Sequence, residues 1–244
     1  GTYIAHELKT GHLTPVYLRF YHAMYQVLMF AMNLALLANN IGLMWVAVEL
    51  ATLTTVLMVG IYRTPEALEA AWKYFILGSV GIALALFGTI LVYLASSSVL
   101  GEGMEAMAWS VLVQRASTFD PALLNLAFVF LLLGYGTKVG LVPLHAWLPD
   151  AYPEATVTGA VFMSAFTTKT AVYVLARGFA GFEILAVMGV LMTLYGVFYA
   201  TIENNARRIL AYHIVSQVGY MVAGVGIGTA MTLDGAAAHA YAHI

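Results

Sequence analysis

The residues Tyr74–Ala95, YFILGSVGIALALFGTILVYLA, contain no Asp, Glu, Lys or Arg. A continuous apolar run of about 20 residues is enough to cross a lipid bilayer as an α-helix. The strands of a membrane barrel would instead alternate apolar and polar residues over about ten positions. The stretch therefore predicts a transmembrane helix.

Apolar runs of similar length lie on both sides of this stretch, separated by polar connections. We expect an all-α polytopic membrane protein in which residues 1–244 form a single membrane domain, with seven complete transmembrane helices and a truncated eighth that begins at Gly235. The six other complete runs are His22–Ala38, Ile41–Ile61, Pro121–Val142, Ala155–Ala176, Phe179–Ile202 and Ile209–Ala230.

Two connections are long. Residues Tyr62–Lys73 predict a polar loop, and the middle of Ser96–Asp120 (Met107–Ser117) predicts a short helix at the membrane surface. The last run, Gly235–Ile244, has roughly half the length that a spanning helix needs. Together with a start at Gly1 rather than Met, it predicts an internal fragment of a longer membrane protein. The alternative is a complete small protein with a re-entrant end.

The composition agrees with a membrane protein and excludes several functions. Hydrophobic residues make up 62% and charged residues 9% of the chain, against about 45–50% and 25% in soluble domains. A net charge of −2 gives no basic surface for nucleic acid. Without cysteine there are no disulfides, Cys-based zinc sites or iron–sulfur ligands. No dinucleotide-binding or phosphate-loop motif is present, so we expect no cofactor and no independent catalytic centre.

The positions of Lys and Arg predict the orientation. Cytoplasmic connections carry an excess of these residues. If the helices alternate in direction, six of them lie on one side, which we expect to be cytoplasmic and to include the chain start, and Arg115 and Arg177 lie on the other. The six are Lys9, Arg19, Arg63, Lys73, Arg207 and Arg208.

Three ionisable residues, Glu49, Lys138 and Lys169, interrupt the apolar runs. Each charge at the centre of a spanning helix costs roughly 2.5–3.5 kcal/mol, so three cost on the order of 8–10 kcal/mol. We therefore expect them to face one another or a hydrated cavity, where a change in their separation would change their proton occupancy. The alternatives are a structural ion pair, or lysines that extend to the headgroups; Glu49 is too short to do so.

Small residues and a proline surround Lys138. Gly134, Gly136, Gly140 and Pro143 predict a broken helix, which membrane proteins tolerate where it lines a cavity or is buried in protein. The alternative role for the glycines is close helix packing.

Two segments resemble a known family. The segment Gly136–Ala155, GTKVGLVPLHAWLPDAYPEA, is similar to the signature of antiporter-like proton-pumping membrane subunits. These occur in respiratory complex I, in energy-converting hydrogenases and, as the D-type subunit, in Mrp-type cation/proton antiporters. The segment Glu203–Gly226 resembles the connection between the family's ninth and tenth helices. The resemblance implies an inverted-repeat fold in which residues 22–176 form the first unit (family helices four to eight) and residues 179–244 begin the second.

The resemblance also implies roles for individual residues. Glu49 matches the buried glutamate of the family's fifth helix, Lys138 the lysine of its broken seventh helix, and Lys169 the central lysine of its eighth. His239 and His243 lie where the family has histidines on its eleventh helix. In the family, protons pass along such a chain of residues. The chain stops before the family's exit residue on the twelfth helix.

The expected function is thus translocation of H⁺, or exchange of Na⁺ for H⁺, by a subunit of a multi-subunit complex in a bacterial or archaeal inner membrane. Residues Met44–Ser97 resemble the hydrogenase-linked subunits, whereas Ala155–His243 resemble the Mrp D-type subunit. The redox partner, if any, therefore stays open. The alternative function is a structural or quinone-contacting membrane subunit that conducts no ions.

The remaining polar residues have weaker signals. His239 and His243, four residues apart, share a helix face that could hold zinc or haem. No carboxylate follows as a metalloprotease requires, so we expect a proton relay or plain packing and no metal. The candidates for a polar rim are Lys73, His145, Asp150 and Glu154. The alternatives are a loop histidine with satisfied hydrogen bonds for His145 and solvated turn residues for Asp150 and Glu154.

Overall fold

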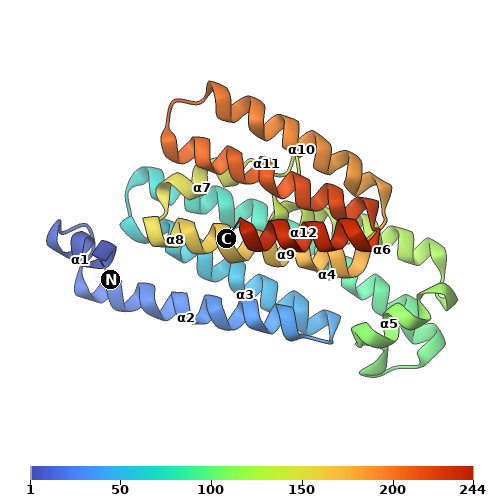
Figure 1. Cartoon of the computed structure of the whole chain (residues 1–244). Helices are drawn as coiled ribbons and strands as arrows, with labels where there is room; N and C mark the ends of the chain where they lie inside the picture. The colour runs from blue at the N-terminus through green and yellow to red at the C-terminus, as the bar shows by residue number, and fades with distance from the viewer. Residues whose placement is uncertain (1, 244) are drawn as a thin grey trace.

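The computed structural model describes residues 2–243; Gly1 and Ile244, the ends of the predicted domain, lie outside them. The long helices run side by side in a bundle, with α1 and α5 at its opposite ends (Figure 1). The helices are α1 Thr2–Lys9, α2 Pro15–Leu37, α3 Ile41–Val59, α4 Pro65–Leu100, α5 Trp109–Arg115, α6 Pro121–Val139, α7 Leu148–Glu154, α8 Val157–Phe162, α9 Thr168–Phe179, α10 Glu183–Ile202, α11 Ala206–Ile227 and α12 Ala230–Ala242.

Within residues 2–243, seven segments are long and apolar enough to cross a membrane. They are α2, α3, α4, α6, the continuous pair α8–α9, α10 and α11. The prediction of seven spanning helices is confirmed, and the chain is an integral multi-pass membrane protein. The shorter α12 occupies the region of the expected eighth helix.

The prediction that Tyr62–Lys73 form a polar loop is wrong. Helix α4 already begins at Pro65, because Thr64 caps it: its hydroxyl accepts a hydrogen bond from the amide of Ala67 at 3.1 Å. Proline suits the first helical position, where its missing N–H is not needed. The first two turns of α4 carry Glu66 and Glu69, so hydropathy alone places the start of the helix too late.

The short surface helix predicted within Met107–Ser117 is confirmed as α5. Its amino-terminal end is tied to the connection between α2 and α3, because the amide of Trp109 donates to the carbonyl of Asn39 at 2.6 Å. The side chain of Asn39 adds a second bond to Ser110 at 2.9 Å.

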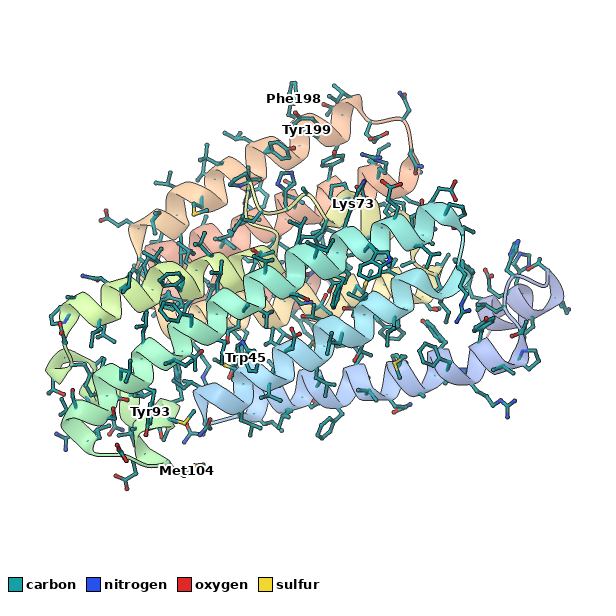
Figure 2. The ribbon with its side chains drawn as sticks, turned by 180° about the vertical axis from the view of Figure 1, so that it is seen from behind. Trp45, Lys73, Tyr93, Met104, Phe198 and Tyr199 are labelled. Carbon is teal, nitrogen blue, oxygen red and sulfur yellow. The ribbon has the colours of Figure 1, made fainter. Side chains whose placement is uncertain are left out.

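The outer surface of the bundle is apolar. Leu37 is 82% exposed and Phe198 is 60% exposed, and Phe198 points away from α10 (Figure 2). Such side chains stay in contact with lipid in a membrane. The interior, by contrast, contains the buried polar residues described next.

Candidate ion pathway

The broken helix lies where the sequence places it. Helix α6 ends at Val139, and Gly140 adopts a left-handed conformation with φ of 84°. The amides of Gly140 and Leu141 donate to the carbonyl of Gly136 at 2.9 and 2.8 Å, which closes the last turn. Pro143 has no N–H with which to continue the helix. The chain becomes helical again at Leu148, the start of α7.

For two of the four residues predicted to break the helix, the structure favours the alternative role of close packing. Gly134 and Gly136 lie inside α6 rather than in the break. A Cβ at Gly134 would lie 2.5 Å from the Cβ of Ala85 on α4, and one at Gly136 would lie 2.6 Å from the side chain of Leu141. These glycines therefore allow close packing, while Gly140 and Pro143 end the helix.

Lys138 occupies the last turn of α6 and is 3% exposed. Its ammonium group donates a hydrogen bond to the phenolic oxygen of Tyr74 at 2.6 Å. That oxygen lies 2.7 Å from the hydroxyl of Thr55 on α3. The carboxyl end of a helix carries partial negative charge, so the break places the lysine where its cation is stabilised.

Trp147 covers this pair. Its ring stacks on Tyr74, with the ring centres 4.4 Å apart and an angle of 17° between the planes. Its indole N–H donates to the carbonyl of Thr137 at 2.8 Å. A carbonyl near the end of α6 thus gains a partner, and the loop after the break is fixed against the lysine.

Glu49 projects from α3 towards the same region. Its charge interacts electrostatically with that of Lys138, although no ion pair within 4.0 Å joins them in the described part of the chain. Its Oε2 atom is buried and has no hydrogen-bond partner among the described residues. The carboxylate and the ammonium group therefore lie near each other without direct contact.

Lys169 forms a second buried site. A π-helical turn, Met163–Thr167, joins α8 to α9 directly before it, and such turns are common at functional sites. The ammonium group of Lys169 donates to the carbonyl of Ser164 at 2.7 Å and lies 3.0 Å from Nδ1 of His243.

The histidines continue this site along α11 and α12. The rings of His239 and His243 lie 6.1 Å apart, and His213 of α11 lies 5.8 Å from His243. Tyr220 of α11 meets His239 at 5.8 Å. The structure thus brings Lys169, His239 and His243 together, as predicted, and adds His213.

Tyr152 of α7 lies between the two lysine sites. Its hydroxyl is directed towards Thr167 and Thr168, and it is buried with no hydrogen-bond partner among the described residues. Buried polar groups are normally satisfied by protein or by internal water. The space between Tyr74 and Lys169 is therefore bordered by polar atoms rather than by a purely apolar core.

The polar rim is held by ion pairs. Lys73 contacts Glu69 at 2.8 Å and Asp150 at 3.1 Å, and Arg208 contacts Asp150 at 3.7 Å. Lys73 lies near the start of α4, on the side where α11 begins (Figure 2). These residues and Glu154 line a polar cavity of about 280 Å³.

His145 does not belong to this rim. It is 8% exposed and meets the ring of Tyr195 on α10 edge-on at 4.5 Å. The loop after the break folds back into the bundle, so the expected rim position of this histidine is corrected.

Glu203 connects the rim to the turn between α10 and α11. One of its carboxylate oxygens accepts hydrogen bonds from the amides of Asn204 and Asn205 at 2.9 and 3.1 Å. The other lies 3.2 Å from Arg208. The bond from Asn205, then that from Asn204 and the charge of Arg208, hold the pKa of the Glu203 carboxyl below its usual range.

Sequence reasoning missed three residues of this arrangement: Tyr74, Tyr152 and His213. Tyr74 begins an apolar stretch and Tyr152 lies in the connection before another, and aromatic residues are common near the ends of spanning segments in any membrane protein. His213 had a usable signal, because it is a histidine inside an otherwise apolar run.

The fold and the site define a polytopic membrane protein with a line of lysine, glutamate and histidine side chains beside a broken helix. Both lysines are buried, and Glu49, His239 and His243 are half-buried. The chain belongs to the NADH:quinone oxidoreductase/Mrp antiporter transmembrane family, whose model matches residues 38–244. The resemblance stated from the sequence is thereby confirmed.

Similar proteins include members of several complexes. The chain is 49% identical over 239 residues to a hydrogenase-4 component F homolog of Methylacidiphilum infernorum, covering 94% of this chain and 50% of that protein. It is 35% identical over 217 residues to NADH-quinone oxidoreductase subunit N 2 of Rhizobium meliloti, covering 84% and 44%. A chain of the membrane-bound sulfane sulfur reductase, an archaeal respiratory membrane complex, superposes with a TM-score of 0.83 at 25% identity, covering 90% and 46%. The chain thus spans half or less of the length of these proteins.

Proposed function

We propose that this chain translocates protons, alone or in exchange for Na⁺, as one subunit of a multi-subunit membrane complex. The observation that carries the proposal is the placement of Lys138. A buried amine that is bonded to Tyr74 and lies near, but not against, the carboxylate of Glu49 can gain or lose a proton as that distance changes.

The proposed route has two stations, each with a buried lysine. Glu49 and Lys138 form the first, and Lys169 with His243 and His239 forms the second. The hydroxyls of Tyr74 and Tyr152 lie between them and supply polar atoms to a connecting chain of water. When a proton moves from one station to the next, the charge at both stations changes. Each charge alters the electrostatic energy of the groups at the other station, so the protonation states of the two stations are coupled.

The polar rim supplies the access to the first station. Lys73, Asp150 and Glu154 border a polar cavity at the end of the bundle where α4 begins and α7 lies. Carboxylates at this position collect protons from the aqueous phase. The excess of Lys and Arg at this end supports a cytoplasmic placement, and with it a cytoplasmic start of the chain in a bacterial or archaeal inner membrane.

The repeat organisation is part of the proposal. Residues 22–176 would form the first unit of an inverted repeat and residues 179–244 the start of a second. Each lysine lies next to an irregular point in its helix: a break after Lys138 and a π-helical turn before Lys169. Other membrane subunits are the expected partners, because the similar proteins are named as components and subunits of complexes.

Proton transport in everted membrane vesicles tests the proposal. Lys138→Ala and Glu49→Gln should abolish acidification of the vesicle lumen while leaving the amount of assembled protein largely unchanged. Lys9→Ala, which removes an exposed lysine of α1, is the matched control. Normal transport by Lys138→Ala would contradict the proposal. Loss of assembly or of quinone reduction alone would instead favour the non-conducting subunit, and collapse of the pH gradient on addition of Na⁺ would identify exchange.

A further inference from the structure

An apolar groove lies on the outer surface of the bundle, and none of its lining residues belongs to the two lysine sites. Helix α3 packs against both α2 and α4 and lies between them in Figure 2. The groove opens where α2 and α4 begin and α3 ends, and it has a volume of about 610 Å³. Its lining includes Phe20, Leu57, Trp72 and Phe75.

The walls of the groove face outward. Trp72 is 61% exposed, Leu57 is 48% exposed and Phe20 is 39% exposed. All three belong to segments that are apolar enough to span the membrane. The groove therefore lies along the hydrocarbon layer, near the level where aromatic side chains such as Trp72 mark the membrane interface.

The cationic side chain of Arg63 lies at the end of the groove. Arg63 belongs to the two-residue connection before α4 and has a φ of 55°, a conformation that residues other than glycine rarely adopt. Its guanidinium carbon lies 4.9 Å from the centre of the Tyr17 ring. Among the described residues no carboxylate lies within 4.0 Å of Arg63.

We propose that this groove binds one phospholipid with an anionic headgroup. The phosphate contacts Arg63, and an acyl chain lies along Phe20, Leu57 and Phe75. The guanidinium group matches phosphate in shape and charge, and basic pockets at the cytoplasmic ends of spanning helices are a known class of lipid headgroup site. This proposal does not depend on ion translocation.

The charge of Arg63 favours lipid over a helix of a neighbouring subunit. An apolar helix in the groove would remove water from the arginine without neutralising it, which is unfavourable. A phospholipid fills the apolar part and provides the missing negative charge at the same time. The stacked Tyr17 already orients the guanidinium, so little side-chain freedom is lost on binding.

Native mass spectrometry of the complete protein, purified in detergent and titrated with phosphatidylglycerol or phosphatidylcholine, tests the site. The unaltered protein should bind one phosphatidylglycerol in preference to phosphatidylcholine. Arg63→Gln should weaken phosphatidylglycerol binding roughly tenfold, as expected for the loss of a charge-assisted hydrogen bond. Arg19→Gln, which removes an exposed arginine of α2 outside the groove lining, should have no effect.

A second variant separates charge from shape. Leu57→Trp fills the groove and leaves Arg63 in place, so it should also weaken binding, even if Arg63→Gln fails to fold. Equal binding of phosphatidylglycerol by all variants would overturn the proposal. A second experiment places a photo-crosslinking residue at position 57 of the protein in cell membranes. Capture of a protein instead of a lipid would also overturn the proposal.

Discussion

The ammonium group of Lys138 lies 2.6 Å from the phenolic oxygen of Tyr74 and 4.8 Å from the centre of its ring. The tyrosine is itself held by Thr55 of α3 and by the stacked ring of Trp147. Two separate parts of the chain therefore fix the partner of the buried lysine. The position of Lys138 does not require an ion pair with Glu49, which leaves that carboxylate able to change its distance from the lysine.

Tyr74→Phe is expected to impair transport without disturbing the stack on Trp147. It removes one hydrogen bond to a charged group, which is worth about 1.5–3 kcal/mol. We expect the proton-transport rate in everted vesicles to fall roughly tenfold, the factor that corresponds to about 1.4 kcal/mol. Tyr93→Phe, on the same helix, is the control and should behave like the unaltered protein. An unchanged rate in Tyr74→Phe would remove the tyrosine from the pathway.

Trp147→Phe should weaken the structure at the helix break. The aromatic stack is kept, but the carbonyl of Thr137 loses its indole donor, and leaving such a buried group unpaired costs about 1–3 kcal/mol. The midpoint of thermal unfolding in detergent should fall. Trp109→Phe serves for comparison, because no hydrogen bond of its indole nitrogen is seen among the described residues. An identical midpoint for both variants would contradict this role of Trp147.

The number and type of the spanning helices could be predicted from the sequence because lipid imposes a minimum length of apolar chain. The ends of the helices could not. Helix α4 extends from Pro65 to Leu100, well past the apolar run Tyr74–Ala95, because capping by Thr64 and not hydropathy sets its start. The π-helical turn Met163–Thr167 could not be predicted either, because no residue pattern in the apolar segment indicates it.

The charged residues of the candidate site could be predicted from the sequence, whereas its neutral residues could not. Glu49, Lys138 and Lys169 are conspicuous because charge is rare in apolar segments. Tyr74 and Tyr152 acquire their positions only when α4 and α7 pack beside the break. The sequence leaves the role of Gly134 open for a related reason: spacing along the chain does not distinguish a glycine that ends a helix from one that allows close packing of a neighbouring helix.

Gly134→Ala should therefore destabilise the protein through the contact between α4 and α6. Its Cβ would meet the Cβ of Ala85 and the carbonyl oxygen of Gly81, both at 2.5 Å. Overpacking of this kind costs about 1–3 kcal/mol, which should appear as a lower midpoint of thermal unfolding. Gly235→Ala on α12 has no atom within 4 Å of the new Cβ and should leave the midpoint unchanged or raise it, since alanine favours helices. A lower unfolding midpoint for Gly235→Ala than for Gly134→Ala would contradict the packing role of Gly134.

Glu203→Gln should have a pH-dependent effect on stability. Because the amides of Asn205 and Asn204 and the charge of Arg208 lower the pKa of this carboxyl in the folded protein, its ionised form favours the folded state. That contribution is fully present above the pKa of the unfolded chain and is lost as the pH falls through the lower folded value. The variant should thus unfold at a lower temperature than the unaltered protein at neutral pH. The difference should shrink below about pH 4, the usual range of glutamate; a difference that stays constant with pH would contradict this assignment.

His213→Gln tests whether the histidine that the sequence analysis overlooked takes part in transport. His213 lies 5.8 Å from His243, which in turn lies 3.0 Å from the ammonium group of Lys169. If protons pass through this cluster, removal of one imidazole should slow transport several-fold, because the relay loses a group that can both accept and donate a proton. His22→Gln, at an exposed position of α2, is the matched control. A slower rate that only follows a reduced amount of assembled protein would assign His213 a packing role, and unaltered transport would exclude it from the route.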